Sequence, residues 1–331
     1  MKKVLQQLFE HEPLSRQEAH AVMQQIAENA FSDPEIAALI TVYLMRSITI
    51  DELQGFRDAL MEQVNPVDLK GQPVLDMVGT GGDGKNTFNI STLSCFIVAG
   101  AGVKVAKHGN YAASSVSGSS NVLEQLGYKF SKRSEDLLQE LEAANICFLH
   151  APLFHPALKQ VAHIRKSLGF RSFFNMLGPL VNPAHPQYQM IGVYNLEMAR
   201  FYNYMLQAGS TEYSIVHGLD GYDEIALTGD TRVITRKGER TFSAAELGKR
   251  TVTPADIYGG NSIAEAAKIF LQILQGKGSW AQNAVVLANA AMALECAGAA
   301  ANYDDCYQLA IESLESGRAY SCLQTLTSMK A

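Results

Sequence analysis

A cluster of glycines directly after an apolar run constrains the fold of this chain most. Residues 74–78 are apolar apart from one aspartate, and four glycines follow between positions 79 and 84. A short polar stretch at 87–92 then opens an apolar segment of helical length, which ends near Gly100. A second, largely apolar run at 103–106 ends in Lys107. This order predicts a strand, a glycine loop, a helix and a second strand.

In such a βαβ unit both strands run parallel, so the loops after them emerge at the same edge of the sheet, where ligands bind. The loop contributes backbone N–H groups, the helix start a partial positive charge, and Lys107 a full one. We therefore expect a site for an anion, most simply a phosphate. A glycine-rich turn without a ligand is the alternative, which the convergence of glycines, hydroxyls and a lysine disfavours.

Two known phosphate motifs nearly match this loop, and both fail. The glycine spacing fits a dinucleotide fingerprint, but Lys104 and Lys107 stand where that motif needs an acid for the ribose. A NAD-dependent dehydrogenase is therefore disfavoured. The spacing also imitates a P-loop, but Asn86 replaces the Ser or Thr that binds Mg²⁺. Asp83 inside the loop would repel a phosphate unless a metal ion or a ligand hydroxyl lies between them.

Charge and cysteine content exclude several classes of protein. The 331 residues carry a formal net charge of −6, whereas nucleic-acid-binding proteins usually show a basic surface. Five cysteines without CxxC spacing disfavour a disulfide framework or a zinc site and fit a reducing compartment. No apolar run reaches the ~18 residues of a membrane span, and residues 1–10 lack the apolar core of a signal peptide. We therefore expect a cytoplasmic protein with neither a nucleic-acid nor a membrane partner.

The chain divides into a helical beginning and a longer α/β part. Residues 1–65 contain two capping boxes, which begin at Ser15 and Thr49, and 65–71 is the candidate linker. These patterns predict a small all-helical N-terminal domain and a larger α/β domain with a mostly parallel central sheet flanked by helices. Beyond the glycine region, strands are expected at 146–149, 189–193 and 213–216, a β-hairpin at 231–242, and helices at 122–126, 135–144, 155–168, 196–207 and from 261 onward with a turn at 276–278.

An adjacent acid pair, Asp223 and Glu224, comes just after a predicted strand. Neighbouring carboxylates bind hard cations, and Mg²⁺ usually takes one or two carboxylates together with substrate phosphates. An ordinary acidic turn is the alternative, and the dipeptide alone favours it because such turns are common.

Three basic residues also admit two interpretations. Lys107 could be solvated, but its place beside the glycine loop favours a phosphate contact. His108 could be a general base, although a lone histidine is more often structural. Arg165 is suited to bind a carboxylate in a fork, yet with Lys159 and Lys166 nearby the residues alone favour a solvated basic face.

The motifs GTGGDG, TFNIST and KHGN, in this order, resemble those of the anthranilate phosphoribosyltransferase family. This family belongs to the glycosyltransferase group that also contains pyrimidine nucleoside phosphorylases. The resemblance runs from the N-terminal helices to the C-terminal ones. It implies a small helical domain, residues 1–66 with part of 165–188, and a phosphoribosyl-binding α/β domain, residues 72–164 and 189–331. It also implies a homodimer joined through the helical domain.

The activity that the resemblance implies is transfer of the phosphoribosyl group of phosphoribosyl pyrophosphate (PRPP) to the amine of anthranilate. This is the second dedicated step of tryptophan synthesis, and it releases pyrophosphate. A pyrimidine nucleoside phosphorylase-like enzyme, or a relative that uses another aromatic acceptor, is the alternative. A phosphorylase would use inorganic phosphate and would not need the acid pair. A non-enzymatic nucleic-acid-binding relative should be basic, and this chain is acidic.

The resemblance also implies roles for individual residues. The segment GYDEIALTG resembles the family's magnesium segment, which favours a metal site over an acidic turn. Asp223 and Glu224 would hold Mg²⁺, Ser91 would help to hold a second ion, and Lys107 would join the two acids in catalysis. Anthranilate would be bound by Gly79, Asn110 and Arg165. The PRPP-binding positions would be Gly79, Gly82, Asp83, Thr87, Asn89, Ile90, Ser91, Thr92, Lys107, His108, Gly109, Asn110, Ser115 and Ser119.

Two positions depart from the family's motifs. Tyr111 stands where the family usually has an arginine after KHGN, and Asn121 stands where it usually has an aspartate. Both lie in or beside the serine-rich segment that follows Asn110. Tyrosine cannot add positive charge, so we expect Tyr111 to pack or hydrogen-bond there, with its ring partly buried and its hydroxyl at a polar edge.

Overall fold

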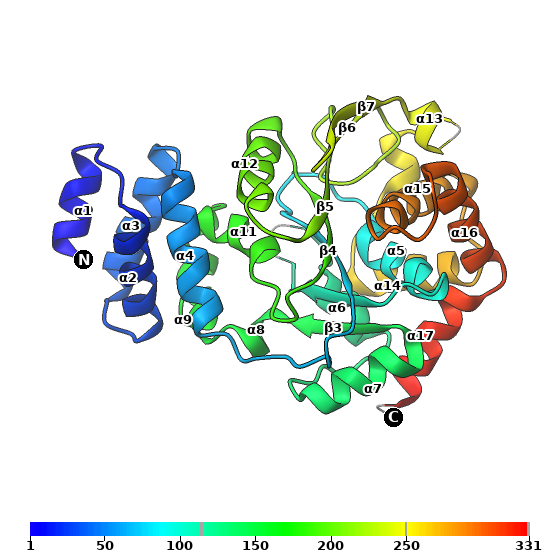
Figure 1. The fold of residues 1–331 in the computed structure, drawn as a ribbon, viewed down its shortest axis with the longest axis horizontal. Helices are drawn as coiled ribbons and strands as arrows, with labels where there is room; N and C mark the ends of the chain where they lie inside the picture. The colour runs from blue at the N-terminus through cyan, green and yellow to red at the C-terminus, as the bar shows by residue number, and fades with distance from the viewer. Residues whose placement is uncertain (113–114, 249, 330–331) are drawn as a thin grey trace. The chain divides into compact units, whose positions relative to one another are not determined.

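The computed structural model describes residues 1–112, 115–248 and 250–329. The chain divides into two compact units, Met1–Pro66 with Ala151–Pro183, and Val67–His150 with Ala184–Ala331 (Figure 1). We expected the chain to return to the helical domain within 165–188, but it returns at 151, because α9 packs on α2 and α10 on α3. No helix among these described residues has the length and apolar character needed to cross a membrane.

The first unit is helical throughout its regular structure. Gly55 on α4 allows this helix to approach α2 closely, because a Cβ there would lie 2.3 Å from the carbonyl oxygen of Arg16. The predicted helix 155–168 is in fact two helices, because the helical conformation is interrupted at Val161. The helices are α1 (Lys2–Phe9), α2 (Arg16–Ala27), α3 (Asp33–Met45), α4 (Ile50–Glu62), α8 (Ala151–Phe154), α9 (Pro156–Gln160), α10 (Ala162–Leu168), α11 (Phe173–Leu177) and the 3-10 turn η1 (Gly178–Leu180).

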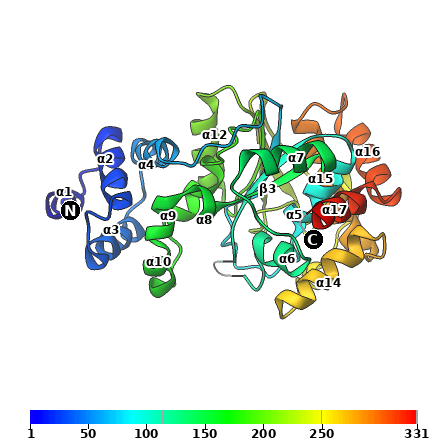
Figure 2. The same ribbon diagram turned by 90° about the horizontal axis from the view of Figure 1, so that it is seen from below.

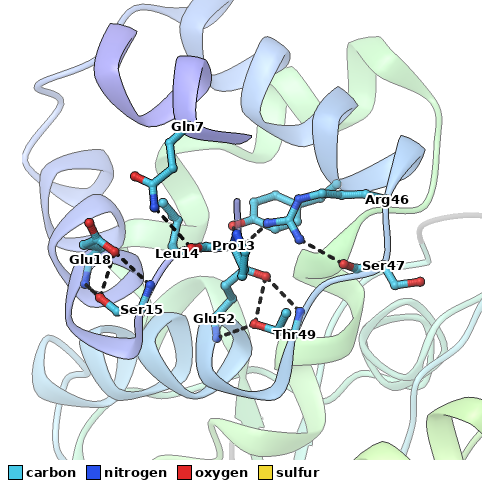
Figure 3. A network of polar contacts seen from close by, with 10 residues as sticks. Gln7, Pro13, Leu14, Ser15, Glu18, Arg46, Ser47, Thr49 and Glu52 are labelled. Atoms are coloured by element: carbon cyan, nitrogen blue, oxygen red, sulfur yellow. Dashed lines mark hydrogen bonds and ion pairs between the residues drawn. The ribbon is translucent and has the colours of Figure 1, made fainter. Parts of the chain in front are cut away.

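A buried carboxylate joins three parts of this unit (Figure 3). Glu52 is fully buried, and its Oε1 accepts hydrogen bonds from the Leu14 N–H at 2.9 Å and the Tyr43 hydroxyl at 3.0 Å. The same oxygen pairs with the Arg46 guanidinium. Oε2 accepts from the N–H and hydroxyl of Thr49 at 2.8 and 3.0 Å, completing the predicted capping box. Burial opposes ionisation, but Arg46 and these N–H groups outweigh it, so the pKa of Glu52 lies below its usual value.

This network predicts a stability difference between two matched capping boxes. Glu52→Ala should lower the free energy of unfolding by about 3–5 kcal/mol, because it leaves the partly buried guanidinium of Arg46 and several buried donors without their carboxylate. Glu18 holds the equivalent place in the exposed capping box that begins at Ser15. Glu18→Ala should therefore lower the free energy of unfolding by about 1 kcal/mol or less. Urea unfolding followed by circular dichroism measures both losses. Equal losses in the two variants would contradict the role of the Glu52 network.

The second unit is built on a seven-stranded sheet of order β3-β2-β1-β4-β5-β6-β7. The first five strands run parallel, and the hairpin β6–β7 adds two antiparallel strands at one edge. The predicted fold class and the predicted hairpin are therefore confirmed. The strands are β1 (Leu75–Gly79), β2 (Val105–Gly109), β3 (Ile146–His150), β4 (Tyr188–Gly192), β5 (Glu212–Gly218), β6 (Thr231–Thr235) and β7 (Gly238–Phe242).

Helices cover both faces of this sheet. In Figure 1 α12 lies on one side of β5 and α15 on the other, and Figure 2 also shows α15 next to α5. The C-terminal region has two turns beyond the predicted one, where Gly298 and Gly317 adopt φ of 69° and 78°. The helices are α5 (Ile90–Gly100), α6 (Ser119–Gln125), α7 (Ser134–Ala144), α12 (Leu196–Gln207), α13 (Ala244–Gly248), η2 (Pro254–Ile257), α14 (Ile263–Leu274), α15 (Trp280–Cys296), α16 (Tyr303–Glu315) and α17 (Arg318–Met329).

The strand order reverses at β1, and this reversal marks the binding edge. β1 pairs with β2 on one side and with β4 on the other, in register from Leu75 opposite Tyr188 to Gly79 opposite Gly192. The chain continues from β2 to β3 in one direction and from β4 to β5 in the other. Parallel α/β sheets bind ligands beyond the carboxyl ends of the strands at such a reversal. The predicted glycine loop leaves β1 at this point.

Candidate active site

The glycine loop after β1 turns in the way its sequence predicts. Gly81, Gly82 and Gly84 have φ of 62°, 79° and 76°, a region that residues with a Cβ rarely adopt. The Thr80 N–H donates to the carbonyl of Gly192 at 2.9 Å, which extends the contact between β1 and β4. The buried Thr80 hydroxyl has no hydrogen-bond partner within the described part of the chain. The loop therefore places an unused hydroxyl at the end of the central strands.

Asp223 crosses directly over the ends of β1 and β4. Its backbone carbonyl oxygen lies 1.6 Å from where a Cβ on Gly192 would be, and its Oδ2 lies 2.6 Å from the corresponding position on Gly79. Oδ2 also accepts the Gly81 N–H at 2.8 Å. Only glycine at positions 79 and 192 allows this approach. The loop glycines and the predicted acid pair therefore form one structure.

Glu224 is held from the side of α5. Its Oε1 accepts the N–H of Ser91, in the first turn of that helix, at 2.9 Å. The next residue, Ile225, exchanges two hydrogen bonds with the buried side chain of Asn289 on α15, at 3.1 and 2.9 Å. The acid pair is thus fixed by the glycine loop, by α5 and by α15. Asn289 was not predicted, because a single asparagine within an apolar helix carries no signal of its partner.

Ionisation of both acids is less favourable than usual. Burial, and then the charge of Asp83, raise the pKa of Asp223 to about 7. Burial, and then the charge of Asp223, raise the pKa of Glu224 well above its usual value, although Lys107 acts in the opposite sense. Nearby negative charges in a region of low dielectric constant are stabilised by a cation. A cation beside Asp223 and Glu224 would therefore relieve their repulsion.

The donor set fits Mg²⁺ better than a metal held by protein alone. Among the residues described, no group of three or more His, Cys, Asp or Glu side chains is arranged to hold a metal ion. Mg²⁺ prefers oxygen ligands and usually keeps several waters and substrate phosphate oxygens. Carboxylate oxygens of Asp223 and Glu224, with the unused Thr80 hydroxyl at the end of β1, suit an ion that arrives with an anionic substrate.

The two basic residues at the end of β2 are buried. Lys107 donates from Nζ to the carbonyl of Met77 on β1, so its ammonium supports the central strands. The His108 N–H donates to Oδ1 of Asp76 at 3.1 Å. Lys107 still acts on the charge of Glu224. Its predicted contact with a substrate phosphate, and that of His108, stay predictions.

The serine-rich segment after β2 is tied to the first turn of α6. The carbonyl of Asn110 accepts from the Ser120 N–H at 3.2 Å and from the Ser119 hydroxyl at 3.3 Å. Gly109 lets the Ser119 hydroxyl approach the backbone, because a Cβ at this position would lie 2.3 Å from that hydroxyl. The Asn89 side chain reaches across to the carbonyl of Ser117 at 2.9 Å and so connects this segment with the start of α5. Residues 113 and 114 lie outside the described residues.

Arg165 belongs to the first unit, on α10, whereas every other predicted site residue belongs to the second. Its guanidinium donates to Oδ1 of Asn175 at 3.3 Å and lies over the ring of Phe174, 5.5 Å from the centroid. The predicted site residues that lie in the second unit are Gly79, Gly82, Asp83, Thr87, Asn89, Ile90, Ser91, Thr92, Lys107, His108, Gly109, Asn110, Ser115, Ser119, Asp223 and Glu224.

A helical unit together with an α/β unit that carries a glycine loop at the reversal of its strand order is typical of a class of glycosyl-transferring enzymes. Residues 71–320 match the family model "Glycosyl transferase family, a/b domain", and residues 2–64 match "Glycosyl transferase family, helical bundle domain". The chain belongs to this glycosyl transferase family.

Within that family the similar proteins are anthranilate phosphoribosyltransferases. The enzyme of Cytophaga hutchinsonii is 53% identical over 324 residues, which cover 98% of this chain and 99% of that protein. The crystal structure of the Thermus thermophilus enzyme matches with a TM-score of 0.91 and 33% identity, covering 99% of each chain. The Saccharomyces cerevisiae enzyme in complex with PRPP and Mg matches with a TM-score of 0.90 and 26% identity, covering 98% of this chain and 96% of that one.

Proposed function

We propose that this protein transfers the phosphoribosyl group of PRPP to the amine of anthranilate and releases pyrophosphate, the second step of tryptophan biosynthesis. Full-length similarity to anthranilate phosphoribosyltransferases supports the proposal, as does the complex of the yeast relative with PRPP and Mg. The observation that carries it is the acid pair, which the Gly81 and Ser91 N–H groups hold at the reversal of strand order.

The chemistry asks the protein mainly for positioning and for neutralisation of charge. The bond from the ribose anomeric carbon to pyrophosphate breaks, a bond from that carbon to the anthranilate nitrogen forms, and the nitrogen loses a proton. Because an aryl amine is neutral at pH 7, no strong base is needed to activate it. Pyrophosphate leaves with high negative charge, so interactions that grow with this charge lower the barrier. The glycine-loop N–H groups and the start of α5 can supply such interactions.

Mg²⁺ would neutralise the leaving pyrophosphate when it is bound. Asp223 and Glu224 would hold the ion, and we expect a second ion with Ser91 among its ligands. The acid pair also separates this proposal from a pyrimidine nucleoside phosphorylase, which would use inorganic phosphate and would gain nothing from two metal-binding carboxylates. For this reason we do not favour a phosphorylase.

The acid pair gives the most direct prediction from this proposal. The Asp223→Asn, Glu224→Gln double variant should lose at least about 100-fold of its Mg²⁺-dependent turnover, because it removes both charges while keeping side-chain shape. Turnover is followed as loss of anthranilate fluorescence in the presence of PRPP and Mg²⁺. Asp230→Asn is the matched control, an exposed acid a few residues further on, and should keep full activity. Normal turnover of the double variant at limiting Mg²⁺ would refute the metal-binding role of the acid pair, and a wild-type protein that consumes no anthranilate would refute the proposed function.

Arg165 is our candidate for the carboxylate of anthranilate. Guanidinium groups bind carboxylates through two parallel hydrogen bonds. In the described part of the chain Arg165 pairs with no acid and only hydrogen-bonds Asn175. Burial lowers the pKa of its guanidinium, which is the effect expected of a cation that lacks an anionic partner.

We expect Arg165→Ala to raise the KM for anthranilate about tenfold or more while the KM for PRPP changes less than about threefold, since only the carboxylate contact is lost. Lys166→Ala, the exposed neighbour on α10, is the control and should leave both KM values unchanged. An equal rise in both KM values of the Arg165 variant would contradict the assignment.

We also propose that the protein works as a homodimer in the cytoplasm. The first unit exposes Phe9 and Met45 by 62% and 85%, which fits an apolar contact with a second copy. All five cysteines are free thiols, as is usual for proteins in a reducing compartment. Static light scattering at micromolar concentration should give twice the mass of one chain, and a monomer mass would refute the dimer.

A further inference from the structure

Tyr111 makes specific contacts on both sides. Its hydroxyl donates to the carboxylate of Glu124 on α6 at 2.8 Å. Its ring meets the ring of His150 edge-on, with centroids 4.7 Å apart and planes at 73°. His150 also stacks on the ring of Phe130, with centroids 4.7 Å apart. Tyr111 is 43% exposed, yet it contacts both α6 and the end of β3. We expected from the sequence that it would pack or hydrogen-bond in this region.

His150, which contacts Tyr111, also contacts the first turn of α6. Its Nδ1 lies 2.8 Å from the hydroxyl of Ser120, and both residues are buried. The N–H of Ser120 in turn donates to the carbonyl of Asn110. Tyr111, His150, Ser120 and Asn110 thus form a closed circuit of contacts, because Asn110 and Tyr111 are adjacent in the chain.

Asn121 holds together the two ends of the serine-rich segment, Ala112 and Gly118. Its Oδ1 accepts the N–H of Ala112 at 2.9 Å and the N–H of Gly118 at 3.0 Å. The two ends approach so closely that a Cβ on Gly118 would lie 2.4 Å from the Ala112 nitrogen. One neutral side-chain oxygen therefore fixes the backbone on both sides of the segment. We call Tyr111, Asn121, Glu124, Ser120 and His150 the segment clamp.

The segment clamp reduces a cost that substrate would otherwise bear. Fixing the backbone of a residue costs conformational entropy, and a ligand that must order a segment binds more weakly by that free energy. Asn110 and Ser119, which we expect to contact substrate, lie just outside the two clamped ends and are hydrogen-bonded to each other. The clamp itself uses a neutral phenol and a neutral amide at the two positions that depart from the family's motifs.

We propose that Tyr111 and Asn121 are positioning residues, which hold Asn110, Ala112 and Gly118 in place for the phosphoribosyl donor without touching it. The role rests on the proposed function, because the donor is PRPP. It predicts that loosening the clamp weakens PRPP binding in the ground state, whereas bound PRPP restores the geometry needed for the chemical step. KM for PRPP should therefore change much more than kcat.

Kinetics of two truncations and two conservative variants test this role. Tyr111→Ala and Asn121→Ala should each raise the KM for PRPP about five- to tenfold and change kcat less than about twofold. Asn121→Asp keeps an acceptor oxygen and Tyr111→Phe keeps the ring contact, so each should recover most of the loss. Tyr204→Ala removes an exposed tyrosine of α12 and should change nothing. Melting temperatures within a few degrees of wild type show that each variant is folded.

Hydrogen exchange supplies a readout that does not depend on turnover. In the ligand-free protein, peptides that cover 110–121 should exchange faster in both alanine variants, and PRPP with Mg²⁺ should slow them again. Faster exchange with an unchanged KM, or unchanged exchange, would overturn the positioning role. A wild-type protein that transfers nothing to anthranilate refutes the proposed function, whereas an active wild type whose Tyr111→Ala variant keeps its KM refutes only this inference.

Discussion

The close approach of Asp223 to the ends of β1 and β4 is the contact on which the rest of the site depends. Positions 79 and 192 must be glycine for the chain to cross there, since the carbonyl oxygen of Asp223 occupies the place of a side chain on Gly192. The Gly81 N–H then receives the carboxylate. This crossing sets the position of Glu224, which reaches the first turn of α5. The fold thus places two acids beside the groups best suited to bind an anion.

Placing two acids so close together is costly for the ligand-free protein, and this cost favours a cation as a partner. Burial and mutual repulsion raise the pKa values of Asp223 and Glu224, so both acids resist ionisation near neutral pH. Lys107 relieves part of this repulsion, but its ammonium already donates to the Met77 carbonyl. A divalent cation that carries a pyrophosphate group would supply the missing positive charge and use the loop N–H groups together.

Much of this site could be predicted from the sequence, because glycine clusters and acid pairs follow strands within a few residues. Asn289 could not, since its partner Ile225 lies 64 residues away. Gly192 gave no signal either, because its requirement arises only when the loop after β5 crosses β4. The break of the predicted helix at Val161 was also missed, since neither proline nor glycine marks it. Tertiary approach, which local pattern does not encode, accounts for the misses at Asn289 and Gly192.

The increase in melting temperature caused by millimolar Mg²⁺, measured across pH, tests the central claim most directly. Carboxyls with raised pKa values stabilise the metal-free protein below their unfolded pKa values, and this contribution is lost as pH rises through about 7, the pKa of Asp223. Mg²⁺ must displace these protons, so its stabilising effect should grow as pH rises from about 6 to 8 and vanish in the Asp223→Asn, Glu224→Gln variant. An effect independent of pH, or one that persists in the variant, would contradict the claim that these two acids form the metal site.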